Sequence, residues 1–351
     1  MKMKMASQGD HKKLKVLHVH DVAFVGSTLV SGLRSIGVDA ELYTFLSIKN
    51  SKLPKILRAF STAVLRFLEV FRLGRYIGNK SFDIIHVHYG SFAYLALLNR
   101  IPFYLHIHGT DVRKFIHWPV LGNIIRKGLE KAITVFYTTP DLKELVEPYR
   151  KDAVFFPNPI DTDKFRPPVD QKPTQTPVIF NINKIDRFKG LDRVLSGLEL
   201  LWEQMPEVQV MMFGFGNALE EAQDFLTRHA EDPRLTLLSR VLHEEMVKLI
   251  QNSTLVLGQM STGAMGCSEL EAMACAKPVV CNFSYESMYP SPPPVFKAET
   301  AEEARDQMIW ILKHPELAQE KSAEAREWIV NNFNKKLVAQ KLVQIYCGKE
   351  S

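Results

Sequence analysis

A loop of small residues followed by a helix with a carboxylate is the strongest chemical feature of the sequence. Residues 258–266 read GQMSTGAMG, and we expect a helix over about Cys267–Ala276. Small residues allow a ligand to approach the backbone, and the free N–H groups of a helix start bind anions such as a diphosphate. Glu271 lies one turn into this helix, where its carboxylate can accept hydrogen bonds from ribose hydroxyls. The segment predicts a nucleotide site; the alternative is a packed helix with a solvated glutamate.

A second charged segment follows an expected strand at Val178–Asn181. It reads NKIDRFKG from Asn183 and places Lys184 and Lys189 five residues apart. Negative charge gathers on a diphosphate as the bond to it breaks, and cations beside it lower the barrier. The alternative interpretation is a solvated basic loop, which is common. The position directly after a strand favours a site for a departing nucleotide diphosphate.

Three expected strands end in a His-x-His pair. The pairs are His18/His20, His86/His88 and His106/His108. Residues i and i+2 of a strand share one face, so each pair could converge on one ligand. A metallohydrolase would also show this pattern and is the main rival class of enzyme. The other interpretation is that the first histidine of each pair is packed and only the strand-end histidine is accessible, and we favour it.

These segments resemble one known family. Leu270–Val280, LEAMACAKPVV, resembles the signature of GT4, a family of retaining glycosyltransferases with the GT-B fold. In GT4 the helix glutamate binds the donor ribose, and the backbone before the helix holds the diphosphate. The resemblance implies these roles for Glu271 and for residues 264–267. It extends over most of the chain, from about Leu14 onward.

Two further motifs carry the same resemblance. The segment NKIDRFKG is similar to the family's GRL-x-x-x-KG, in which an arginine and a lysine neutralise the departing diphosphate. His108-Gly109-Thr110-Asp111 resembles the family's HG-x-D, whose histidine lies beside the donor sugar. The residues thereby implied to be catalytic are His108, Lys184 and Lys189. Those implied to bind the donor are Gly26, Gln259, Gly263, Ala264, Met265, Gly266, Cys267 and Glu271.

The sequence departs from the family pattern at one important position. GT4 has two glutamates separated by seven residues, and the position eight before Glu271 is Gly263. Glu269 is not an easy substitute, because residues two apart on a helix point about 200° apart. Gln259, at the end of a strand, could supply a neutral hydrogen bond instead. Gly263 leaves open a GT-B protein that binds a nucleotide or a partner without turnover.

Short apolar runs alternate with longer helical segments along the chain and must position these residues. Near-continuous apolar strands between helices indicate parallel sheets that are covered on both faces. The expected strands are Leu14–Val19, Ile84–His88, Phe103–His108, Ile133–Tyr137, Val154–Phe156, Val178–Asn181, Val208–Phe213, Leu235–Leu238, Leu255–Leu257 and Val279–Cys281.

The strand pattern restarts after the polar, proline-rich residues 167–173, which we interpret as a linker. We therefore expect an α/β chain of the GT-B type, with two Rossmann-like, doubly wound domains facing across a cleft. Residues 1–167 would form the acceptor-side domain and 168–334 the nucleotide-sugar domain. A C-terminal helix in 335–351 would pack back on the first domain. Ligands of such sheets bind beyond the carboxyl ends of the strands.

Residues 53–77 are expected to form a basic amphipathic helix. Polar positions recur every three or four residues and include Arg58, Arg66 and Arg72, while aliphatic and aromatic residues fill the opposite face. Such a helix suits an anionic membrane interface. The alternative is a helix whose apolar face packs on its own sheet. We expect these arginines to hold the protein at a membrane that carries a glycan or lipid-linked acceptor.

Composition limits the remaining classes of function. The 351 residues hold four cysteines without a CxxC pair, which argues against a disulfide framework or structural zinc and fits a reducing compartment. The polar N-terminal segment is not a signal peptide, and a net charge of +5 does not indicate nucleic acid binding. We expect a cytoplasmic enzyme, peripheral on the inner face of the membrane. It would move a hexose-type sugar from a UDP- or GDP-sugar with retention and without a cofactor or metal.

Overall fold

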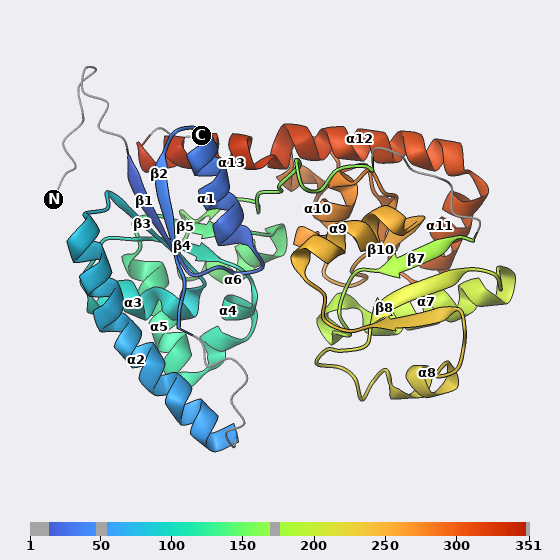
Figure 1. Cartoon of the computed structure of the whole chain (residues 1–351), viewed down its shortest axis with the longest axis horizontal. Helices are drawn as coiled ribbons and strands as arrows, with labels where there is room; N and C mark the ends of the chain where they lie inside the picture. The colour runs from blue at the N-terminus through green and yellow to red at the C-terminus, as the bar shows by residue number, and fades with distance from the viewer. Residues whose placement is uncertain (1–13, 47–54, 169–175, 349–351) are drawn as a thin grey trace. The chain divides into compact units, whose positions relative to one another are not determined.

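The computed structural model describes residues 14–46, 55–168 and 176–348, which divide into two compact units (Figure 1). Most of the expected linker, residues 169–175, lies outside the described residues. The chain passes from the first unit to the second at Pro159–Ile160 and returns to the first at Asn334–Lys335. Residues 139–141 also belong to the second unit.

The first unit is built on a six-stranded parallel sheet with the order β2-β1-β3-β4-β5-β6. Its strands are β1 (Lys15–Val19), β2 (Asp39–Tyr43), β3 (Ile84–His88), β4 (Tyr104–Ile107), β5 (Val135–Tyr137) and β6 (Val154–Phe155). Its helices are α1 (Val25–Ser35), α2 (Lys55–Lys80), α3 (Ala93–Leu98), α4 (Thr110–Arg113), α5 (Pro119–Lys131), α6 (Lys143–Val146) and α13 (Lys335–Tyr346).

The two faces of the first sheet are covered by different helices (Figure 1). Leu17, Val87 and Leu105 belong to a core that also contains residues of α2, α3 and α5. The strand residues between them point to the other face, which α1 and α13 cover and which carries the histidines. α1 and α13 approach closely, because a Cβ on Gly32 would lie 2.3 Å from the Lys335 carbonyl oxygen. A side chain at this position would push the two helices apart.

The second unit repeats this plan with the strand order β12-β11-β10-β7-β8-β9, again entirely parallel. Its strands are β7 (Val178–Asn181), β8 (Gln209–Phe213), β9 (Leu235–Leu238), β10 (Leu255–Leu257), β11 (Val279–Cys281) and β12 (Phe296–Lys297). Its helices are α7 (Leu191–Gln204), α8 (Gln223–Arg228), α9 (His243–Asn252), α10 (Cys267–Ala274), α11 (Ala301–Lys313) and α12 (Pro315–Phe333). Short 3-10 turns of the whole chain lie at Gly90–Phe92, Phe115–His117, Pro140–Leu142, Arg187–Lys189 and Glu286–Met288.

Alternate residues of the second sheet enter two separate cores. Ile179, Leu255 and Leu257 pack with α7 and α11, whereas Phe180 and Val256 pack with α10 and α12. Because both faces are buried, the strands read as continuous apolar runs, as expected from the sequence. The ends of β7, β9, β10 and β11 coincide with the sequence-based expectation.

Helix α2 packs on the rest of the first unit through the side that carries Glu69. Glu69 is buried, and its carboxylate accepts hydrogen bonds from the Tyr43 hydroxyl (2.6 Å) and the Leu46 N–H (2.7 Å). Val70 and Leu73 enter the core beside this contact. The alternative, that the apolar face of this helix packs on its own sheet, is wrong for its described members, which are exposed: Leu57, Val64, Phe67, Leu68 and Phe71.

The arginines of α2 differ in their surroundings. The Arg66 guanidinium lies 4.7 Å from the centre of the Phe45 ring, so this side chain stacks on its own unit. Arg72 pairs with Glu69 at 3.0 Å and remains half-exposed. The side chain of Arg58 lies outside the described part of the structure.

Candidate functional site

The small-residue loop before α10 is held by Glu269. This carboxylate is completely buried and accepts hydrogen bonds from the N–H groups of Gln259 and Gly266, both at 2.9 Å. It also accepts one from the side-chain amide of Asn183 at 3.1 Å. Burial raises the pKa of Glu269, but the Lys189 ammonium and these donors outweigh burial and hold the pKa below its ordinary value. An ionised Glu269 therefore fixes both ends of the loop.

Gln259 and Gly263 shape the same loop from within. The Gln259 side chain is buried, its oxygen accepts the N–H groups of Ser261 and Thr262, and its nitrogen donates to the Asn282 carbonyl. This amide, which we expected to face a donor sugar, holds its own loop instead. Gly263 has a φ of +65°, and a Cβ there would lie 2.3 Å from the Ser284 hydroxyl oxygen. The position of the missing family glutamate thus has a backbone that suits glycine.

The structure brings Lys189 to the start of α10. A Cβ placed on Gly266 would lie 3.6 Å from Lys189 Nζ, so this ammonium stands beside the residue that precedes the helix. Gly190 makes the approach possible: its φ is +69°, and a Cβ there would lie 2.7 Å from the backbone of Met260. An ammonium beside a helix N-terminus is an anion-binding arrangement.

Lys184, the other expected cation, has a different environment. Its ammonium lies 3.5 Å from Asp186, and its side chain is 54% exposed. The Asp186 carboxylate also accepts the Phe188 N–H and so shapes the turn that leads to Lys189. Of the two lysines, Lys189 is the one that the structure places against the loop and helix of the predicted diphosphate site.

Glu271 takes part in a charged triad that the sequence did not reveal. Its Oε1 lies 2.8 Å from His243 Nε2, and Lys164 Nζ lies 3.0 Å from His243 Nδ1. Because an ammonium only donates, His243 accepts at Nδ1 and donates from Nε2 to the carboxylate. Burial raises the pKa of Glu271, and His243 opposes this rise. Among the described residues the second carboxylate oxygen has no hydrogen-bond partner, so it remains able to accept from a ligand.

His243 and Lys164 were missed because their link to Glu271 exists only in the folded chain. His243 is the first residue of α9, and Lys164 precedes the first strand of the second unit. Both residues lie in segments that resemble parts of the family pattern, but nothing in those segments links either residue to Glu271. The only sequence signal is that both residue types can form hydrogen bonds to a carboxylate.

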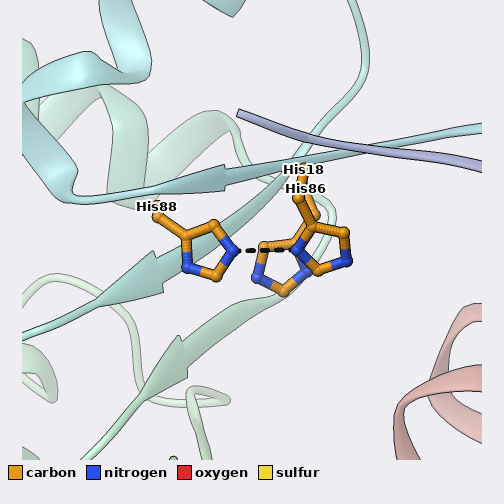
Figure 2. Close-up of side chains that lie close together, drawn as sticks. All are labelled: His18, His86 and His88. Carbon is orange, nitrogen blue, oxygen red and sulfur yellow. Dashed lines mark hydrogen bonds between the residues drawn. The ribbon is translucent and has the colours of Figure 1, made fainter. Parts of the chain in front are cut away.

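One cluster in the first unit contains His18, His86, His88, His106 and His108, and Figure 2 shows the first three of these side chains. The strand register places His18 beside His86 and His88 beside His106, all on the face that α13 covers. All four are completely buried, whereas His108 is partly exposed. The expectation that first members of the pairs are packed is confirmed. The expectation that each strand-end histidine is accessible is wrong for His88.

Hydrogen bonds link these rings to one another. His18 Nδ1 lies 2.8 Å from His88 Nε2, a contact that Figure 2 marks, and His88 Nδ1 lies 3.1 Å from His108 Nε2. His86 Nε2 lies 3.3 Å from His106 Nδ1. Within the described residues, nitrogens of His18, His86 and His88, and likewise of His88, His106 and His108, lie within 4.8 Å of one another. That spacing could also suit a metal ion.

Burial keeps these rings uncharged. It lowers the pKa of His18 to about 3 and that of His106 to about 4. Burial, together with the neighbouring imidazoles, lowers the pKa of His86, His88 and His108 well below the ordinary value. At neutral pH each ring therefore has one N–H donor and one acceptor nitrogen.

Asp111 fixes the turn that presents His108. Its buried carboxylate accepts the N–H groups of Gly109 (2.7 Å), Gly90 (3.0 Å), Val112 (3.1 Å) and His108 (3.2 Å). Burial raises the pKa of Asp111, and these four donors oppose the rise. The aspartate of the HG-x-D motif thus holds the backbone at the end of β4.

Gly26 lies in the first turn of α1 and is buried. A Cβ there would lie 2.7 Å from the His20 carbonyl oxygen, so glycine is required for the helix to start this close to β1. The Asp21 carboxylate accepts the Ser27 N–H at 3.1 Å and satisfies one free donor of the helix start. Gly26 therefore has a packing role that does not depend on a ligand.

Comparison with known proteins follows the division of the chain. Residues 28–164 match the family model described as Glycosyltransferase Family 4, and residues 162–328 match the model described as Glycosyl transferases group 1. A trehalose synthase of Pyrococcus horikoshii is 25% identical over 90% of this chain and 86% of its own length. N-acetyl-alpha-D-glucosaminyl L-malate synthase of Bacillus anthracis is 27% identical over 76% of this chain and 75% of its own.

Solved structures share the fold at low sequence identity. Sucrose-phosphate synthase of Thermosynechococcus elongatus has a TM-score of 0.73 at 17% identity and covers 95% of this chain and 98% of its own. HepE of Anabaena in complex with UDP-glucose has a TM-score of 0.69 at 14% identity, with coverages of 95% and 100%. The two parallel Rossmann-like sheets and these neighbours confirm the predicted GT-B fold. The two family matches, which together span residues 28–328, identify the chain as a glycosyltransferase of the GT4 type.

Proposed function

We propose that this protein transfers a hexose-type sugar, with retention of configuration, from a UDP- or GDP-sugar to a glycan or a lipid-linked acceptor. The observation that carries the proposal is the pairing, on one short helix, of an anion site with a ribose-type carboxylate. Lys189 stands at the start of α10, and Glu271 lies one turn further on with one oxygen available. The complex of Anabaena HepE with UDP-glucose supports a uridine donor.

Each residue of the site has a role in this proposal. Lys189 and the backbone of residues 264–267 bind the diphosphate and stabilise its charge as the bond to the sugar breaks. Lys184 supplies a second cation from the same segment. Glu271 binds the ribose, and His108 of the first unit binds an oxygen of a substrate. No metal or cofactor takes part.

The first experiment tests donor binding by Glu271. Glu271→Ala removes hydrogen bonds to a carboxylate and should weaken nucleotide-sugar binding by roughly 1–3 kcal/mol, measured by isothermal titration calorimetry. Glu220→Ala is the matched control, because Glu220 is an exposed glutamate of the same unit. If the Glu271 variant binds the nucleotide sugar with wild-type affinity, the proposed contact between Glu271 and the ribose is wrong.

A turnover assay separates the transferase from its rivals. The wild-type protein is incubated with UDP-, GDP- and ADP-sugars, with and without a membrane lipid extract, in the presence of chelator. Nucleotide release that survives chelation and is lost in Glu271→Ala supports transfer and identifies the donor. Binding without release across the panel would favour a protein that binds a donor without turning it over, which Gly263 motivates. Release that requires a metal would contradict the proposed mechanism.

We further propose that α2 holds the enzyme at an anionic membrane. Its exposed stripe includes Phe67, 61% exposed, and Phe71, 63% exposed, with Arg72 and Arg75 exposed beside them. An apolar stripe with basic flanks is the pattern of a helix that lies in a membrane interface. In the described part of the chain, no helix is long and apolar enough to cross a membrane.

Substitutions in the exposed stripe test this contact directly. Phe67→Ser with Phe71→Ser should abolish sedimentation with vesicles that contain phosphatidylglycerol, and charge reversal at Arg72 should weaken it. These side chains support no core contact, so the fold should persist. Arg66 is a poor probe because it stacks on Phe45. Leu219→Ser, an exposed apolar residue of the second unit, is the control. Sedimentation of the double variant at the wild-type level would contradict the membrane contact.

A further inference from the structure

The histidine cluster contains two separate hydrogen-bonded chains. One chain runs from His18 through His88 to His108, with nitrogen–nitrogen distances of 2.8 and 3.1 Å. The other chain joins the hydroxyl of Tyr346 to His86 at 2.6 Å and continues from His86 to His106 at 3.3 Å. Each neutral ring donates one hydrogen bond and accepts one. All the hydrogen bonds in a chain are therefore donated in the same direction along it.

The direction of the second chain follows from its last member. His106 Nε2 lies 3.3 Å from the Phe156 carbonyl oxygen, and a carbonyl only accepts, so the His106 proton is on Nε2. His106 Nδ1 then accepts from His86 Nε2, and His86 Nδ1 accepts from the Tyr346 hydroxyl. Both rings of this chain are therefore protonated at Nε2.

The direction of the first chain is decided at its buried end. His18 is completely buried, and its Nε2 has no hydrogen-bond partner among the described residues. If the protons pointed inward, His18 would hold an N–H group in the core without an acceptor, which is rare and costly. If they point outward, His18 donates from Nδ1 to His88, and His88 donates from Nδ1 to His108. The outward direction avoids the unsatisfied N–H.

The outward direction defines what His108 presents at the surface of the first unit. Its Nε2 accepts from His88, so its own proton must be on Nδ1. His108 Nδ1 has no partner among the described residues, and the residue is partly exposed. An N–H donor therefore remains for a ligand or for water.

We propose that His18 and His88 are positioning residues that hold His108 in the tautomer with its proton on Nδ1, so that His108 donates a hydrogen bond to a substrate oxygen. The role toward substrate rests on the proposed function, whereas the tautomer does not. Acting as a base at Nδ1 would require both bridging protons to move and would leave an N–H unsatisfied at His18. His108 is thereby set to stabilise an oxygen and not to remove a proton.

Nuclear magnetic resonance on the intact free protein tests the tautomers. Long-range proton–nitrogen correlation spectra of protein labelled with nitrogen-15 histidine distinguish Nδ1–H from Nε2–H for each ring, and single substitutions assign the eleven histidines. We expect Nδ1–H for His18, His88 and His108, and Nε2–H for His86 and His106. Nε2–H on His108, a charged ring at neutral pH, or metal-type shifts on adding one equivalent of Zn²⁺ would overturn the proposal.

A pair of variants links the tautomer to function. His88→Leu removes the donor to His108 Nε2, so the proton of His108 should no longer be confined to Nδ1. Tyr346→Phe changes only the second chain and should leave His108 unaltered. Turnover should fall roughly 2- to 10-fold in His88→Leu, the usual worth of one neutral hydrogen bond, and remain near wild type in Tyr346→Phe.

The two readouts separate the inference from the proposed function. If the tautomers are those expected but no nucleotide sugar is turned over, the positioning role stands and the proposed transferase activity is contradicted. A turnover loss in His88→Leu with an unchanged His108 tautomer would overturn the positioning role while the transferase stands. Circular dichroism establishes that each variant is folded before either result is interpreted.

Discussion

Two glutamates that are neighbours on α10 have different tasks because of their helical positions. Glu269 is enclosed by N–H donors of the loop, whereas Glu271 faces His243. They share no partner, as the expected 200° separation implies. The sequence Glu269-Leu270-Glu271 therefore supplies one carboxylate that holds the loop and another that we propose binds the ribose.

The different roles of Glu269 and Glu271 predict different effects of the same substitution on stability. Glu269→Gln replaces an acceptor by an amide that must face the N–H groups of Gln259 and Gly266, so it should lower the free energy of unfolding by about 2–3 kcal/mol. Glu271→Gln should leave stability nearly unchanged. Urea denaturation followed by tryptophan fluorescence of the second unit measures both. Equal stability of the two variants would contradict the role assigned to Glu269 in fixing both ends of the loop.

At the scale of elements, the proposed diphosphate site depends on two loops that are in contact. Gly190 lies at the end of one loop and Met260 in the other, and the positive φ of Gly190 allows their backbones to meet. The Lys189 carbonyl also accepts the Met260 N–H at 2.8 Å. The position of Lys189 is thus set by backbone contact and not by its own side chain.

A methyl group at Gly190 should therefore disturb both fold and binding. Gly190→Ala adds a Cβ that would lie 2.7 Å from the Met260 backbone at a φ that alanine disfavours, which should cost about 2–3 kcal/mol of stability. Because Lys189 moves with the loop, nucleotide binding should weaken as well. In Gly214→Ala, the control, the nearest atom lies at an ordinary 3.5 Å. An unaltered melting temperature and donor affinity in Gly190→Ala would show that the loops can separate.

The sequence predicted the strands that form apolar runs better than the two that do not. β7 and β10 are continuous apolar runs and were located to the residue, but β2 and β12 were missed. β2 is an edge strand that reads DAELY and is only partly buried, and β12 has two residues, so neither produces an apolar run.

For α2 the sequence revealed amphipathicity but not orientation. The apolar stripe looks like a core face, yet Glu69 turns the helix because its carboxylate binds Tyr43 and Leu46. Contacts between residues so far apart in sequence are absent from any local pattern. The same reason explains why His243 and Lys164 were not predicted as partners of Glu271, although the loop, Lys189 and Glu271 were.

At the scale of the molecule, the histidine cluster should make the first unit sensitive to acid. Burial lowers the pKa of these rings, so below about pH 6.5 the unfolded chain binds protons that the folded unit excludes. Stability is then complete above about pH 7 and falls as pH decreases. Four completely buried rings should together cost about 5 kcal/mol per pH unit below about pH 6.

Urea unfolding between pH 8 and pH 5 checks this dependence. The slope of unfolding free energy against pH gives the number of protons taken up on unfolding, and this number should decrease by about one in His106→Leu. In Phe67→Ser, which changes an exposed side chain that does not titrate, the slope should remain that of the wild type. A first unit whose stability is constant over this range would show that the rings are protonated when folded.

The return of the chain to its first unit has a consequence for biosynthesis. All twelve strands of the described residues precede α13, and the second unit is a nearly continuous stretch of chain that can fold while translation proceeds. Until α13 leaves the ribosome, the part of the sheet face that α13 covers is exposed and His86 lacks the Tyr346 hydroxyl. During that interval the nascent first unit exposes this part of its sheet and an unpaired nitrogen of His86. The order of maturation is therefore the reverse of the order of synthesis, and a chaperone that shields the first sheet during this interval would raise the yield of folded enzyme.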